Sequence, residues 1–182
     1  MPATEYDIID LVEGCIVNNR KSQEGLYRSL YRFAMSVAIR YSRDEMDAAD
    51  ILSAAFVKVF KSIRSFDASK GSVHAWVKRI VVNEGLDHIK SRNRFSENVE
   101  LDSEEAPGIN NAAIENMGAS EIMMMIKKLP PATHAVFVLY AVEGYNHREI
   151  ATQLGISEGT SKWHLSEARK SLQKQLQHQN NR

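Results

Sequence analysis

The chain has 182 residues, and its 23 Lys and Arg balance its 23 Asp and Glu to a formal net charge of zero. Its single cysteine, Cys15, excludes an internal disulfide and a cysteine-rich zinc site, and no apolar run approaches the ~20 residues that cross a bilayer. The N-terminus lacks the basic and then apolar pattern of a secretory signal, so we expect a cytoplasmic protein without membrane insertion.

The neutral total conceals a strong segregation of charge along the chain. Residues 1–19 carry a net charge of −4, residues 20–95 carry +7, residues 96–118 carry −6, and the remainder carries +3. The two basic segments predict two surfaces for phosphate backbones, and the acidic strip predicts a connection that avoids nucleic acid.

Helical periodicity recurs along the chain, whereas alternating β-branched runs bounded by turn residues are nearly absent, so the predicted class is all-α. The predicted helices lie near Ile8–Asn18, Ser22–Tyr41, Met46–Ser62, Val73–Arg92, Ala119–Lys128, Pro131–Val142, His147–Leu154 and Ser157–Gln177. We predict two small helical domains, at 8–95 and 119–178. An acidic flexible linker at 96–118, which contains Pro107-Gly108, joins them.

Two carboxylates, Asp47 and Asp50, lie near the start of the predicted helix Met46–Ser62, where free N–H groups favour negative charge. A carboxylate pair can be catalytic, but no histidine, nucleophile or metal-ligand spacing accompanies this one. Helix capping is therefore the better structural interpretation, and a docking surface is the better functional one.

A polar loop, Ser69-Lys70-Gly71-Ser72, precedes a helix that carries aromatic, amide and cationic side chains, among them Trp76, Lys78, Arg79 and Asn83. Such a mixture suits single-stranded nucleic acid, because cations follow phosphates and pockets hold a splayed base. For Trp76 itself, a place in the hydrophobic core is the favoured interpretation.

The segment from Gly144 to Leu172 predicts two helices joined by a tight turn. Gly155 suits the left-handed conformation that ends a helix, and Ser157 suits the N-cap of the next one. We expect the second helix to bury Leu165, Ala168 and Leu172 and to expose a polar, basic face. This is the helix-turn-helix arrangement that places its second helix in the DNA major groove; an ordinary helical hairpin is the alternative.

These motifs together resemble the extracytoplasmic-function (ECF) sigma factors, which are promoter-recognition subunits of bacterial RNA polymerase. The residues that carry the resemblance run from Asp47 to Phe60, from Gly71 to Asn83, from Leu129 to Phe137 and from Glu143 to Lys162. Each motif alone is moderately specific, but both regions occur in the family order with an acidic linker between them.

The resemblance implies three contact surfaces. Core RNA polymerase would be bound by the helix that carries Asp47, Asp50, Ser53 and Lys58. The −10 element, opened to a single strand, would be bound by Ser69, Lys70, Ser72, Lys78, Arg79 and Asn83. The −35 duplex would be read by Thr160, Lys162, Trp163, Ser166, Glu167, Arg169 and Lys170. An anti-sigma factor or another regulator is a further expected partner.

Several residues depart from the family pattern. Ser53 and Ala54 replace a Gln and an acid, which removes part of the polar polymerase contact. Tyr140 stands where an Arg often faces the −35 backbone, and Ser161 stands where many relatives bury Val. Trp163 replaces a small polar residue at an exposed position, from which a side chain can reach base edges.

The leading function is therefore transcription initiation by a monomer that has no catalytic activity, cofactor, metal or small-molecule substrate. A helix-turn-helix repressor or regulator with an N-terminal sensor or dimerisation domain is the second possibility, but it leaves the +7 charge of residues 20–95 unexplained. An enzyme acting on nucleic acid is the third, and the six scattered histidines give it no metal-ligand spacing.

Overall fold

A computed structural model describes residues 5–92 and 118–180. The chain divides into two compact units, Met1–His88 (unit 1) and Ile89–Arg182 (unit 2). All regular structure in the described residues is helical, which confirms the all-α prediction, and none of these helices is long and apolar enough to span a membrane. Of the predicted linker at 96–118, all but Gly118 lies outside the described residues.

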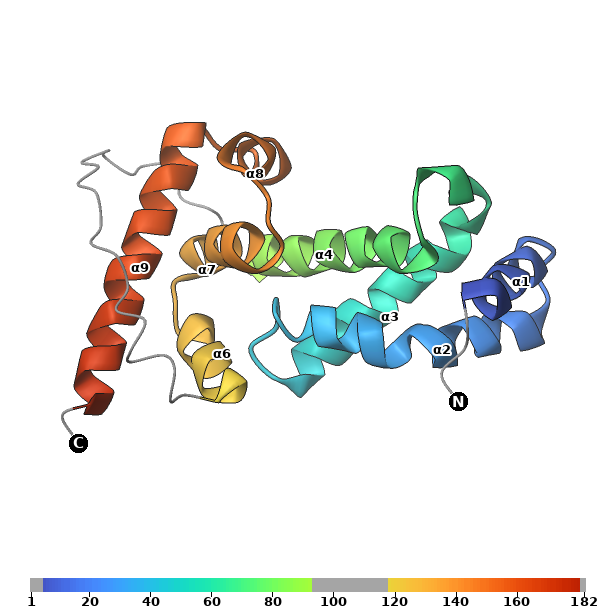
Figure 1. Ribbon diagram of the computed structural model, residues 1–182, viewed down its shortest axis with the longest axis horizontal. Helices are drawn as coiled ribbons and strands as arrows, with labels where there is room; N and C mark the ends of the chain where they lie inside the picture. The colour runs from blue at the N-terminus through green and yellow to red at the C-terminus, as the bar shows by residue number, and fades with distance from the viewer. Residues whose placement is uncertain (1–4, 93–117, 181–182) are drawn as a thin grey trace. The chain divides into compact units, whose positions relative to one another are not determined.

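Unit 1 is built from four helices and two short 3-10 turns. These elements are α1 (Glu5–Ile16), α2 (Arg20–Ala38), α3 (Glu45–Ser62), η1 (Ile63–Ser65), η2 (Ala68–Lys70) and α4 (Val73–Arg92), the last of which ends beyond the unit boundary. Helix α1 packs on α2, and α2 packs on α3 (Figure 1).

Side-chain caps set the starts of α2 and α3. The Asn19 side chain accepts hydrogen bonds from the backbone N–H groups of Lys21 and Ser22, at 2.9 and 3.2 Å. The Asp44 side chain accepts one from the backbone N–H of Asp47 at 2.8 Å. Both helices therefore begin slightly earlier than the apolar pattern predicts, because the caps lie before the first apolar residue.

The core of unit 1 is formed by apolar side chains at helical spacing. Its fully buried side chains include Leu26, Leu30, Val37, Tyr41, Ile51, Leu52, Val59, Val73, Val77 and Val81. Cys15 is buried, and burial raises the pKa of its thiol. Helix α4 approaches Tyr41 closely at Gly85, where a Cβ atom would lie 2.6 Å from the Tyr41 Cβ.

Unit 2 is organised around its long last helix. Its elements are α6 (Ala119–Lys127), α7 (Pro131–Phe137), η3 (Val138–Val142), α8 (His147–Leu154) and α9 (Glu158–Asn180). Helices α6, α7 and α8 all contact α9 (Figure 1). Its buried apolar side chains include Leu129, Val136, Leu139, Ile150, Leu154, Leu165, Ala168 and Leu172, among them the three predicted for α9.

The helix-turn-helix has the expected local chemistry. Gly155 ends α8 in the left-handed conformation, with φ 72° and ψ 37°. The Ser157 hydroxyl accepts a hydrogen bond from the backbone N–H of Thr160 at 2.9 Å, which caps α9. At the start of α8, Asn146 and Glu149 each bond the other's backbone N–H, so the first turn is fixed at both positions.

A change of helix type, and not only of its ends, lies after α7. The expected single helix Pro131–Val142 changes to π geometry over Val138–Val142. There the backbone N–H of Glu143 bonds the carbonyl of Val138 at 3.0 Å, five residues back. Hydrophobic periodicity does not reveal such a turn, because one wide turn barely alters the apolar spacing.

Candidate nucleic-acid interface

Fewer of the predicted polar residues are available on the outer face of α3 than the sequence indicates. Asp50 and Ser53 are exposed, as a docking surface requires, whereas Asp47 is only 8% exposed. Its carboxylate accepts a hydrogen bond from Arg43 Nε at 2.9 Å and lies 3.4 Å from His88 Nε2 of α4. Asp47 therefore joins α3 to α4, and Asp44, which sequence analysis missed, is the residue that caps α3.

Lys58, the fourth predicted polymerase contact, is paired inside unit 1. Its ammonium group forms an ion pair with Glu84, a buried carboxylate of α4, and lies 3.7 Å from Asp87. The hydrogen bond to Glu84 raises the pKa of Lys58, which stays protonated. A carboxylate on a partner would have to compete with Glu84 for this cation.

The polar loop before α4 is organised by Asp67. Its carboxylate accepts hydrogen bonds from the hydroxyl and backbone N–H of Ser69, at 2.7 and 3.0 Å, and pairs with Lys70 at 3.3 Å. The bonds from Ser69, with Lys70 adding to them, lower the pKa of Asp67. The Ser72 hydroxyl accepts a hydrogen bond from the backbone N–H of Ala75 at 3.2 Å and so stabilises the start of α4.

On α4 itself, Arg79 and Asn83 are exposed and lie one helical turn apart, so they share a face. Lys78 is half-buried. Trp76 is also half-buried and packs against Phe66, with ring centroids 5.6 Å apart. The expectation that Trp76 belongs to the core is therefore only partly met: its indole covers the loop that precedes the helix.

The N-terminal half of α9 is less exposed than the polar, basic face that the sequence predicts. Only Lys162 of the predicted outer residues is exposed, while Trp163, Ser166 and Glu167 are half-buried. Trp163 meets the neighbouring His164 ring edge-on at 4.9 Å. One turn further on, Arg169 and Lys170 are half-buried, and Lys170 pairs with Glu167 at 3.3 Å. Thr160 belongs to the cap of the helix through Ser157.

Two imidazole–hydroxyl bonds, which sequence analysis missed, attach α9 to its neighbours. His147 Nδ1 of α8 lies 2.9 Å from the hydroxyl of Ser161, and His164 Nδ1 lies 3.0 Å from the hydroxyl of Thr133 in α7. Burial lowers the pKa of both histidines. The only sequence signal was the hydroxyl of Ser161 at a position that the family pattern makes apolar.

The arrangement offers cations and amides on two separate units. Among residues 5–92 and 118–180, no three His, Cys, Asp or Glu side chains are grouped as a metal site would require. Arg79 and Asn83 on α4, and Lys162 on α9, are suited to phosphates and base edges.

Comparison with known proteins identifies both units. Residues 26–95 match the family model of sigma-70 region 2, and residues 119–172 match that of sigma-70 region 4. The chain is 27% identical over 145 residues to the ECF RNA polymerase sigma factor SigE of Mycolicibacterium smegmatis, a match that covers 77% of this chain but 56% of SigE. It is 28% identical over 167 residues to the ECF sigma factor SigM of Mycobacterium tuberculosis, covering 92% and 83% of the two chains.

The fold is also found among solved structures. The sigma factor RpoE from Bartonella quintana, solved in complex with the anti-sigma factor NepR, superposes with a TM-score of 0.54 at 21% identity, covering 85% of this chain and 96% of that one. The two regions occur in order and together match more than half of the sequence. The chain therefore belongs to the ECF group of the sigma-70 family of RNA polymerase sigma factors.

Proposed function

We propose that this sigma factor binds core RNA polymerase through unit 1 and directs it to promoters through both units. The exposed face of α3, with Asp50 and Ser53, is the polymerase contact. Asp47 and Lys58 contribute indirectly, because the Asp47–His88 contact and the Lys58–Glu84 ion pair join α3 to α4. The corresponding domains are residues 8–95 and 119–178, with 96–118 as the linker.

The −10 element is bound as a single strand by α4 and the loop before it. Arg79 and Asn83 lie on one exposed face, and Lys70 lies on the exposed loop. Half-buried Lys78 flanks this face, while Ser69 and Ser72 shape the loop through their hydrogen bonds. Cations that follow phosphates beside an amide that reads a base are the chemistry that single strands require.

The −35 element is read as duplex by the N-terminal half of α9. Lys162 donates to base acceptors, and Trp163, Ser166 and Glu167 form the edge of the same surface. Arg169 and Lys170 meet phosphates. Thr160 supports the surface from the capped first turn. The capped helix-turn-helix, with exposed Lys162 directly after buried Ser161, is the observation that carries this assignment.

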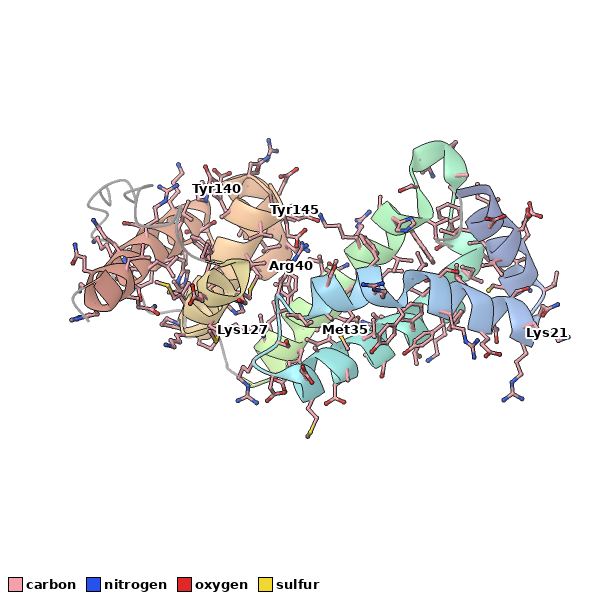
Figure 2. The ribbon with its side chains drawn as sticks, turned by 60° about the horizontal axis from the view of Figure 1, so that its bottom comes forward. Lys21, Met35, Arg40, Lys127, Tyr140 and Tyr145 are labelled. Carbon is pink, nitrogen blue, oxygen red and sulfur yellow. The ribbon has the colours of Figure 1, made fainter. Side chains whose placement is uncertain are left out.

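Transcription from a promoter library by core polymerase with the purified protein tests the proposal. Asn83→Ala should reduce opening around −10, and Lys162→Ala should change which −35 sequences are used. Lys21→Ala provides the matched control, because Lys21 is an exposed cation at the start of α2, outside both surfaces (Figure 2). If the free protein instead bound a palindromic duplex tightly and specifically, it would be a repressor.

An anti-sigma factor is proposed as the regulator, since a relative of the same fold is solved with one. The protein is proposed to act in the cytoplasm, where core polymerase and promoter DNA are found, and as a monomer. We assign it no reaction of its own, because its activity is exercised through the polymerase. Co-purification from cells with core polymerase, in the absence of a second copy of the chain, would support both the partner and the monomeric state.

A further inference from the structure

Three residues from three elements of unit 2 meet beside the start of α9. The ring of Tyr140, in the π turn η3, stacks on the ring of His147 with centroids 4.8 Å apart and planes inclined by 24°. His147, the first residue of α8, reaches the Ser161 hydroxyl through Nδ1 at 2.9 Å. We call these residues the Tyr140–His147–Ser161 contact; Figure 2 labels Tyr140.

Ser161 is buried, so its hydroxyl bonds His147 and not solvent. It is 0% exposed, while its neighbour Lys162 is exposed. A buried hydroxyl without a partner is costly, so the imidazole holds the serine, and thereby the first turns of α9, at one place. An apolar side chain here would pack but would carry no such directional constraint.

The electrostatic surroundings of His147 favour its neutral form. Burial lowers its pKa most, the positive charges of Lys162 and Arg169 lower it further, and Glu158 opposes them. The same two cations are among the proposed DNA contacts of α9. His147 is therefore near enough to these two cations for their charges to lower its pKa.

We propose that His147 and Ser161 are positioning residues for promoter recognition, which set the placement of α9 and so determine how strongly one −35 sequence is preferred over another. This inference rests on the proposed function of α9. Base-edge hydrogen bonds tolerate only a few tenths of an ångström, so a small displacement of Ser161 moves the adjacent Lys162 and Trp163 out of reach.

The test uses the full chain with core polymerase and two promoters that share a −10 element. One promoter has the preferred −35 sequence selected from a library, and the other has a single base pair changed within it. Ser161→Ala and His147→Ala should lower the ratio of transcripts from the two promoters by about three- to tenfold, the effect of one lost hydrogen bond. His147→Asn should restore much of the ratio, because its amide occupies the place of Nδ1.

His147→Gln is the matched control, because its amide reaches the place of Nε2 and misses Ser161. Leu176→Ala is the stability control, since Leu176 is buried near the far end of α9. The inference is overturned if Ser161→Ala reduces both promoters alike, as Leu176→Ala should, or if Gln restores discrimination as well as Asn. Should His147→Ala not fold, the smaller change Ser161→Ala decides the matter.

Lys162→Ala separates this inference from the function on which it rests. If Lys162→Ala leaves −35 preference unchanged, α9 does not read the duplex and the proposed function fails. If Lys162→Ala alters the preference while Ser161→Ala and His147→Ala do not, only the positioning role fails.

Discussion

Replacing Gly85 with Ala should destabilise unit 1, although alanine is the better helix former. A Cβ at this position would lie 2.6 Å from both Cβ and Cγ of Tyr41 and 3.0 Å from its Cδ2. Tyr41 is only 2% exposed, so its side chain is enclosed by the core and cannot swing out into solvent. Either α4 or the tyrosine must shift, and both belong to the packed core.

The size of the effect follows from two opposing contributions. Overpacking a core typically costs about 1–3 kcal/mol, and exchanging Gly for Ala in a helix interior returns about 1 kcal/mol. Because the three close contacts fall on Tyr41 Cβ and on two atoms of its rigid ring, we expect a net loss of about 1–2 kcal/mol. For a domain of this size, that corresponds to a fall in Tm of about 4–16 °C.

Gly25→Ala in α2 is the matched comparison. Its Cβ would lie 2.8 Å from Leu11 Cδ2, the end of a side chain that can rotate, so we expect a change within about 0.5 kcal/mol. Thermal and urea unfolding followed by circular dichroism would measure both variants. A Gly85→Ala protein as stable as the Gly25→Ala protein would show that the α4–Tyr41 contact is looser than described.

Three further predictions concern charge. The pKa of His164 lies below its ordinary value of 6.5 because the ring is buried, so just below pH 6.5 the unfolded chain binds more protons than the folded one. Urea unfolding should therefore show that unit 2 loses stability as the pH falls through 6.5. The loss should be smaller in His164→Asn. Asp47→Asn should lower the Tm of unit 1, whereas Asp50→Asn should leave Tm unchanged and weaken polymerase binding in a pull-down titration; the reverse pattern would exchange their roles. Arg169→Ala should weaken binding to all −35 sequences about alike. It should also reduce the salt dependence of binding by the equivalent of about one phosphate contact. A loss confined to some sequences would contradict this.

Local signals predicted most of the helices because their causes are local. Gly155 and Ser157 act within a few residues of their own positions, and both behave as the sequence indicates. Helix starts were less predictable, since Asn19 and Asp44 cap their helices from just outside the apolar pattern.

The roles of individual site residues depended on contacts between distant segments. Nothing near Lys58 in sequence indicates that Glu84 pairs with it, because the two meet only when α3 and α4 pack together. His147 and Ser161 likewise meet only when α8 turns back on α9. The half-burial of Trp163 is a separate case, because its ring meets that of its sequence neighbour His164, which helical spacing alone does not indicate.

The π turn at Val138–Val142 makes the orientation of the following helix α8 sensitive to the number of residues in this segment. A π turn closes its hydrogen bond one residue later than an α turn, so deletion of exposed Ala141 would allow the helix to continue in ordinary geometry. Each residue in an α-helix advances about 100°, so the deletion would turn α8 and its His147 relative to Tyr140, which now stacks on the His147 ring. The gain or loss of one residue here would thus change the orientation of the helix-turn-helix without altering a residue of its DNA-reading helix.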